Sequence, residues 1–218
     1  DPVTGNKQNY YSNLQCADIA FRNIKFTDYM EFNGWESTLF SVDGLEISGC
    51  LFNMENSAKA STAGTIAAVH IGSSDGERNL KNFRFDSCEF LNAFQGIYVV
   101  NVENISVSNC KFENIKHNAI AMQSSVNGST GGKITVENNT FSNGADRVVR
   151  FNNIREDAVI SIVDNVITDY SDTDGEIIKS GVFAVGAVLN FENNVYNQVV
   201  LDSQNIQGAG TAIVIKNS

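Results

Sequence analysis

The sequence predicts an all-β protein, a right-handed single-stranded parallel β-helix (a solenoid) of about seven to eight circuits. Apolar residues alternate with a period of two over many short segments, which is typical of β-strands. A pattern of two strands joined by an Asn-like bend recurs along most of the chain. The 218 residues include 28 Asn and 17 Gly but one Pro, a composition that favours turns made by residues that tolerate a left-handed backbone.

The repeated unit reads apolar, x, apolar, x, Asn-like, small or Asn, x, aromatic or Ile. Its first apolar residue recurs eight times, at Ile19, Leu45, Phe83, Ile105, Ile134, Ile160, Leu189 and Ile213. The spacings are 26, 38, 22, 29, 26, 29 and 24 residues, so a minimal unit of about 22 residues carries insertions. Because the alternation breaks at the Asn-like step and then resumes, each unit is predicted to form a strand, a sharp bend and a second strand.

A further apolar pair precedes most units and predicts a third strand in each circuit. The pairs are Phe40 and Val42, Val69 and Ile71, Ile97 and Val99, Ile120 and Met122, and Val149 and Phe151. Stacked circuits place each strand about 4.8 Å from its counterpart, in parallel register. We expect residues 17–218 to form this domain, residues 1–16 to form a lead-in or partial cap, and the C-terminal end to contact a neighbouring domain or another copy.

The residue after the Asn-like step forms a column through the predicted stack. Its members are Ile24, Cys50, Cys88, Cys110, Asn139, Asn165, Asn194 and Ser218. Stacked Asn side chains can hydrogen-bond to each other and to the backbone of the bend. The three cysteines of the column would point the same way from parallel strands, so we interpret them as reduced, buried thiols. A metal site made by these thiols is the alternative, although no Cys-x-x-Cys motif or paired His supports it.

With these repeats and this column, the sequence resembles the pectate-lyase-like superfamily, whose parallel β-helices carry a stacked asparagine ladder at a bend. The resemblance covers roughly residues 17–218. It implies an extracellular or cell-surface protein. It also implies that catalysis, where present, uses calcium with a Lys or Arg base, or a pair of carboxylates, on the outer face of the first strand and its loops. The fold hosts lyases, hydrolases, epimerases and binding modules, so it does not select among these functions.

The charge balance excludes one class of partner. With 15 basic and 25 acidic residues the net charge is −10, so binding to nucleic acid would lack its electrostatic contribution. No apolar stretch approaches the roughly 20 residues of a membrane span.

Outward positions beside the apolar pairs provide the candidate catalytic residues Tyr98, Arg150, Lys179 and His70, with Gln123 in the same set and His117 in a short turn. A β-elimination needs a base with a pKa near neutral and a cation that neutralises the uronate. Tyr98 and Arg150 are expected to lie two circuits apart, about 10 Å. A sugar ring can bridge this distance, but a proton transfer cannot.

Two further sets of residues are candidates for ligand binding. Asp172, Asp174 and Glu176 bring carboxylates together in residues 169–176, and calcium prefers such oxygen ligands; a solvated acidic loop is the alternative. Calcium is the one cofactor that this pattern suggests. Trp35, Tyr98 and Tyr170 are the aromatic candidates for stacking on sugars, and a place in the core is the alternative for such residues.

The leading functional hypothesis is an extracellular, scaffold-like β-helix module that binds polysaccharide or a cell-surface protein. The repeats contain no recognisable pair of catalytic acid and base. A polysaccharide lyase or glycoside hydrolase that acts on acidic glycans is the alternative. A structural fibre or surface-layer component is the second alternative.

Overall fold

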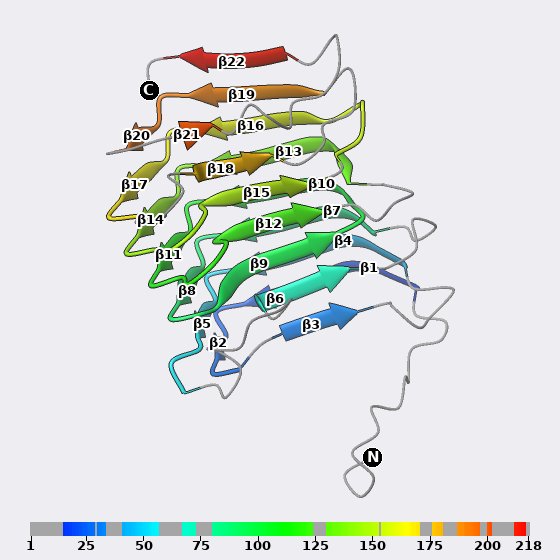
Figure 1. The fold of residues 1–218 in the computed structure, drawn as a ribbon. Coiled ribbons are helices and arrows are strands. Elements are labelled where there is room, and N and C mark those ends of the chain that lie inside the picture. The colour runs from blue at the N-terminus through cyan, green and yellow to red at the C-terminus, as the bar shows by residue number, and fades with distance from the viewer. Residues whose placement is uncertain are drawn as a thin grey trace, which may run out of the picture.

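The computed structural model describes residues 15–28, 30–33, 41–56, 67–72, 80–123, 130–152, 154–170, 176–180, 187–196, 200–201 and 212–216. Throughout these ranges the regular elements are β-strands, which form three sheets that we call A, B and C. The chain visits the three sheets in turn, so each strand pairs in parallel with the strands one circuit before and after it (Figure 1). This all-β arrangement of stacked parallel strands is consistent with a parallel β-helix.

The bounds of the strands follow the chain through the stack. Sheet A contains β1 (Gln15–Arg22), β4 (Ser41–Ser48), β7 (Leu80–Asp86), β10 (Val102–Ser108), β13 (Gly131–Glu137), β16 (Val159–Val163), β19 (Val188–Glu192) and β22 (Ala212–Lys216). Sheet B contains β2 (Lys25–Phe26), β5 (Leu51–Asn53), β8 (Glu89–Leu91), β11 (Lys111–Glu113), β14 (Thr140–Ser142), β17 (Val166–Thr168) and β20 (Val195–Tyr196). Sheet C contains β3 (Met30–Asn33), β6 (Ala67–Gly72), β9 (Gln95–Val100), β12 (Ile120–Gln123), β15 (Val149–Asn152), β18 (Glu176–Ser180) and β21 (Val200–Leu201).

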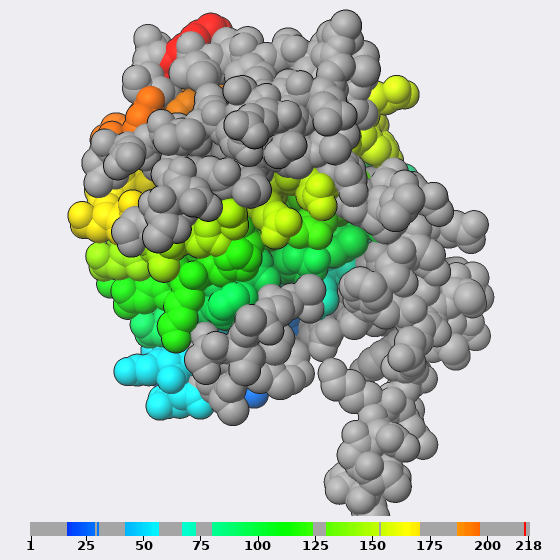
Figure 2. All heavy atoms as spheres, viewed as in Figure 1, coloured from blue at the N-terminus to red at the C-terminus, as the bar shows by residue number. Residues whose placement is uncertain are grey.

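The register of sheet A confirms the predicted repeat. Each of the eight repeat starts lies opposite the next one, from Ile19 opposite Leu45 to Leu189 opposite Ile213. The described residues accordingly form colour bands that follow chain order up the molecule (Figure 2). Insertions between strands therefore leave the pairing of the strands unchanged.

The aromatic position of the repeat forms a stack inside the molecule. Adjacent rings of Phe26, Phe52, Phe90, Phe112 and Phe141 have centroids 4.6–5.0 Å apart and interplanar angles of 2–12°. These distances match the strand spacing of about 4.8 Å, because each ring occupies the same position one circuit further on. Phe52, Phe90, Phe112 and Phe141 are fully buried, so this stack forms part of the core.

One predicted strand was assigned to the wrong sheet. Val42 belongs to β4 of sheet A, and Phe40 lies outside the described residues. The strand of sheet C in that circuit is β3, whose Met30 lies opposite Val69. Gly44 explains the error: its φ of 86° interrupts the alternation, so that Val42 and Leu45 are both buried in one strand although they are three residues apart. The other four predicted pairs do lie in register in sheet C.

Asparagine is abundant because the bends need a left-handed backbone. Of the fourteen described non-glycine residues with positive φ, ten are Asn. Residues with positive φ also form a column at the bend between sheets A and B, one position before the bend column of Cys and Asn. Its members are Asn23, Gly49, Ser87, Asn109, Asn138, Asp164 and Asn193. Asn and Asp tolerate this conformation better than other residues that carry a side chain, and Gly49 does so without a side chain.

The amide part of the bend column forms the predicted ladder. Asn139 Nδ2 donates to Asn165 Oδ1 at 3.0 Å, and Asn165 Nδ2 donates to Asn194 Oδ1 at 2.9 Å. Each Nδ2 also donates to a backbone carbonyl, and each of the oxygens also accepts from the backbone N–H one circuit earlier. All three side chains are buried, so the ladder satisfies polar groups that water does not reach.

The thiol part of the column continues the same pattern. Cys50, Cys88 and Cys110 are buried and carry free thiols, as predicted. The Cys110 N–H donates to Asn139 Oδ1 at 2.8 Å, and the Cys88 N–H donates to Cys110 Sγ at 3.4 Å. The sulfur of Cys110 therefore replaces the amide oxygen as the acceptor for the Cys88 N–H.

Candidate functional site

Sheet C places the predicted catalytic candidates in one row across its strands. His70 lies opposite Tyr98, Tyr98 opposite Ala121, Ala121 opposite Arg150, and Arg150 opposite Lys179. Tyr98 and Arg150 are thus two strands apart, which agrees with the expected separation. The structure describes Lys179 as a backbone position of β18, opposite Arg150.

The environment of Tyr98 does not suit a catalytic base. The side chain is buried, its hydroxyl donates to Gln123 Oε1 at 3.1 Å, and its ring meets the edge of the His70 ring with centroids 4.9 Å apart. Burial raises the pKa of Tyr98, although the nearby Arg150 charge lowers it. A phenol with a raised pKa is a poor base at neutral pH.

His117 belongs to a separate cluster at the turn between sheets B and C. Its Nδ1 contacts Asp146 Oδ2, and Arg147 Nη1 donates to the same oxygen at 2.8 Å. The His117 ring packs on Phe94 with centroids 5.3 Å apart. These contacts link the turn before β12, which contains His117, to the turn before β15, which contains Asp146 and Arg147.

The calcium and aromatic candidates lie mostly beyond what the structure describes. Asp172, Asp174 and Trp35 lie outside the described residues, and Glu176 is described only as the first backbone position of β18. Within the described ranges no group of three or more His, Cys, Asp and Glu residues is placed to hold a metal ion. Tyr170 is described. Its ring lies against Gly144 and packs on the core, and its hydroxyl is buried.

A different feature, a hollow, lies on the outer face of sheet A. We call it the sheet A groove; its volume is about 670 Å³. It crosses β7, β10, β13 and β16, and is lined by Asn82, Phe83, Arg84, Asn104, Ile105, Ser106, Lys133, Thr135, Glu137, Ser161 and Val163. Its volume is in the range of sites that bind small molecules, about 300–1,000 Å³.

Three short hydroxyl side chains form the centre of the groove, and we call them the hydroxyl row. Ser106 lies opposite Thr135, and Thr135 lies opposite Ser161, on adjacent parallel strands. Within the described part of the chain none of these hydroxyls takes part in a side-chain hydrogen bond. The row therefore offers donors and acceptors that are not engaged in the fold.

One edge of the groove is a ladder of amides. Asn104 Nδ2 donates to Asn82 Oδ1 at 3.0 Å, and the backbone N–H of Lys133 donates to Asn104 Oδ1 at 2.9 Å. Asn82 in turn donates to Asp43 Oδ1 at 2.6 Å. Asn82 and Asn104 have positive φ, and the register between β10 and β13 shifts between Glu103 and Ile105, so these bonds hold an irregular part of the sheet and fix the position of this edge.

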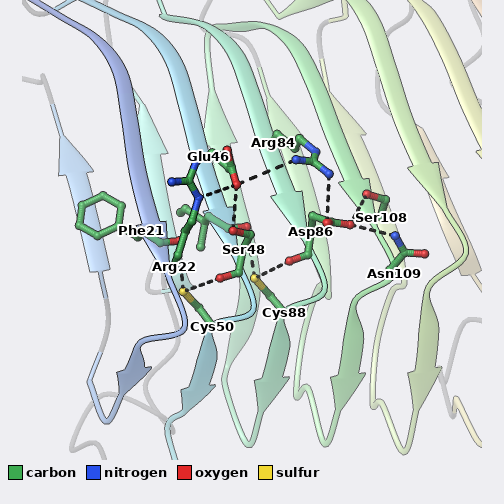
Figure 3. Close-up of polar contacts among 11 residues, drawn as sticks. Phe21, Arg22, Glu46, Ser48, Cys50, Arg84, Asp86, Cys88, Ser108 and Asn109 are labelled. Carbon is green, nitrogen blue, oxygen red and sulfur yellow. Dashed lines mark hydrogen bonds and ion pairs between the residues drawn. The ribbon is translucent and has the colours of Figure 1, made fainter.

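A chain of ion pairs reaches the groove from the N-terminal end of sheet A (Figure 3). Arg22 Nη2 lies 2.9 Å from Glu46 Oε2, and Glu46 Oε1 lies 4.0 Å from Arg84 Nη1. Arg84 Nη2 lies 3.0 Å from Asp86 Oδ2, whose other oxygen accepts from Ser108 and Asn109. The hydrogen bond from Arg22, with a second from Ser48, lowers the pKa of Glu46 to about 2. The charge of Arg84 is thus balanced before the hydroxyl row begins.

Lys133 and Glu137 stand on opposite sides of Thr135 on β13. Neither forms an ion pair with another described residue. Four residues apart on a strand, they lie about 13 Å from each other by Cα separation. The groove therefore has one cation and one carboxylate available for a ligand, and no excess of either sign.

The groove was missed in the sequence because its centre consists of small residues. In the sequence, residues with acid, base or aromatic chemistry point instead to the outer face of sheet C and to the insertions. The signal is nevertheless visible once the repeats are aligned: the residue between the two apolar positions is Ser106, Thr135 and Ser161 in three successive units.

Comparisons of the chain with protein-family models, with curated proteins and with solved structures found no match. Among the residues that the structure describes there is no helix long and apolar enough to cross a membrane.

Proposed function

We propose that this chain is a scaffold-like binding module, without catalytic activity of its own, that holds a polysaccharide in the sheet A groove. The observation that carries the proposal is the hydroxyl row, which lies in a groove of about 670 Å³ and forms no side-chain hydrogen bonds with described residues. Sugars present many hydroxyl groups, and a protein binds them through donors and acceptors that are already in place.

The sheet reduces the conformational entropy that the protein loses when a ligand binds. Ser106, Thr135 and Ser161 have short side chains, so little rotamer freedom is lost when a ligand binds. Their strands are paired on both sides in sheet A, which holds the spacing between the hydroxyls. A site on rigid strands is better ordered in advance than a site on a loop.

The same proposal includes the finer description of the fold and the location of the protein. The stacked parallel sheets and the asparagine ladder support a right-handed β-helix of the pectate-lyase-like kind. An extracellular or cell-surface location goes with that resemblance. A contact with another domain or a second copy at the C-terminal end of the stack is part of the same proposal.

The alternative of a lyase on sheet C has less support. Tyr98 is buried, and its pKa is raised, whereas a β-elimination needs a base with a pKa near neutral. An absorbance assay for unsaturated products from pectate, alginate and glycosaminoglycans tests this alternative directly, and we expect no product.

A glycan array tests the binding function. The wild-type chain is expected to bind a defined set of polysaccharides, and Thr135→Phe, which fills the centre of the groove, is expected to lose that binding. Thr140→Phe makes the same change on the exposed outer face of sheet B and is the matched control. Binding by neither wild type nor control would contradict the proposal, as would equal binding by the two variants.

A further inference from the structure

We infer that the ligand of the sheet A groove is a neutral glycan in extended form that lies along the stacking direction, with successive sugars facing Ser106, Thr135 and Ser161. This inference rests on the proposed function and specifies the chemical class and orientation of the ligand. Three observations support it: the spacing of the hydroxyl row, the balance of charge around it, and the depth of its central residue.

The spacing comes from the pairing of the strands. Because Ser106, Thr135 and Ser161 lie in register, their hydroxyls repeat at the strand spacing of about 4.8 Å. An extended β-linked glycan advances by one sugar over nearly the same distance. A chain that runs across the strands therefore presents one sugar to each hydroxyl, whereas a chain that runs along one strand meets a single hydroxyl.

The charges around the row favour a neutral ligand. Arg84 already faces Asp86 and Glu46, at 3.0 and 4.0 Å. The positive charge of Lys133 is balanced by the negative charge of Glu137 at the opposite edge, and both residues line the groove. A polyanion would place an acid group near Glu137 and would also meet a chain with a net charge of −10. A neutral sugar can accept from Lys133 and donate to Glu137 without such a cost.

Thr135 is the central contact because it is the deepest member of the row. The residue is 8% exposed, whereas Ser106 and Ser161 on either side are only partly buried. A hydrogen bond at the centre of a site is better shielded from water than one at the rim. We therefore expect the loss of the Thr135 hydroxyl to weaken binding more than the loss of either serine hydroxyl.

Calorimetric titration of the full chain tests the inference. The ligands are β-1,4-linked glucose oligomers and oligogalacturonates of matched length, each measured at low and high salt. The neutral oligomers are expected to bind, with an affinity that increases with length until the row is filled and that changes little with salt. Thr135→Val, which removes the hydroxyl but keeps the shape, is expected to weaken binding about 3- to 10-fold.

Thr140→Val on sheet B is the matched control and is expected to bind as the wild type does. Melting curves of both variants establish that each is folded before binding is compared. Tighter, salt-sensitive binding of the oligogalacturonates would overturn the inference and leave the proposed function standing. Equal affinities of the two variants for the neutral oligomers would show that the hydroxyl row is not the site. If neither ligand series bound and the glycan array were also empty, the proposed function would fail, and the inference with it.

Discussion

Asn165 Nδ2 donates a hydrogen bond to Oδ1 of Asn194 at 2.9 Å, although the two residues are 29 positions apart in the sequence. The same Nδ2 donates to the Val136 carbonyl at 2.9 Å, and the Asn165 N–H donates to Asn194 Oδ1 at 3.0 Å. One side chain thus connects three successive circuits at the bend between sheets A and B. This relationship explains why an asparagine at this position contributes to the stability of the whole stack.

Replacement of Asn165 by Leu is expected to destabilise the protein by about 1–3 kcal/mol. The reason is that buried carbonyl and N–H groups lose their partners, while the apolar side chain cannot replace them. Urea denaturation measures the change. Asn190→Leu, on the outer face of β19, is the control and is expected to change stability by much less; equal losses in the two variants would contradict the role of the ladder.

The left-handed bends predict a different response at Asn138, whose φ is 54°. Asn138→Val is expected to cost about 1–2 kcal/mol, because a β-branched side chain clashes with the backbone in this conformation. Asn138→Gly is expected to retain most of the stability. Chemical denaturation of the two variants separates the explanations: if Gly were as harmful as Val, the Asn side chain and not its backbone conformation would be responsible.

The ion pair between Arg22 and Glu46 predicts a specific dependence on pH. Because hydrogen bonds from Arg22 and Ser48 lower the pKa of folded Glu46 to about 2, its carboxylate stabilises the fold above the unfolded pKa of about 4.3. This contribution is expected to be lost as the pH falls from about 4.3 through about 2.

An NMR titration of the Glu46 carboxyl carbon measures this pKa. Arg22→Gln is expected to raise it towards the ordinary value for glutamate, whereas Arg155→Gln, which alters a different ion-pair cluster, is expected to leave it unchanged. A Glu46 midpoint near 4 in the wild type would show that the contact with Arg22 does not persist in solution.

The buried thiols predict slow chemical modification. Hydrogen bonding with Cys88 and burial raise the pKa of Cys110, and burial raises the pKa of Cys50, so little reactive thiolate forms at neutral pH. The hydrogen bond with Cys110 lowers the pKa of Cys88, so the protection of Cys88 depends on its burial. We expect Cys50, Cys88 and Cys110 to resist a thiol reagent in the folded protein and to react fully in urea. Mass spectrometry of labelled peptides identifies each site. Rapid labelling of Cys110 in native buffer would contradict its buried position.

The fold was predictable because its main determinants are periodic. The position of Phe112 between Phe90 and Phe141, for example, follows from the alignment of the repeats alone, since identical spacing within each unit produces identical positions in the stack. The prediction failed at Val42, where the positive φ of Gly44 shifts the alternation within one strand. A single left-handed residue within a strand leaves no distinct signal in hydrophobic periodicity.

The candidate site was harder to predict because it is formed by small residues that lie side by side on adjacent strands, and not by residues of a reactive type. Thr135 has no distinctive chemistry by itself, and it becomes part of a groove because Ser106 and Ser161 are also small and lie beside it. Tyr98 shows the converse: its residue type suggests sugar stacking or acid–base chemistry, yet its hydroxyl donates to Gln123, its ring packs on His70 and burial raises its pKa. What an outward side chain can do depends on its neighbours on adjacent strands, as His70 and Gln123 show for Tyr98.

An NMR titration with a neutral β-linked oligosaccharide tests the placement of the site most directly. The account predicts that the amide resonances of Ser106, Thr135 and Ser161 shift together and saturate at one ligand concentration, while those of Tyr98 and Arg150 on sheet C stay in place. Shifts confined to Tyr98 and Arg150 would contradict the account, because they would place the ligand on sheet C and not in the sheet A groove.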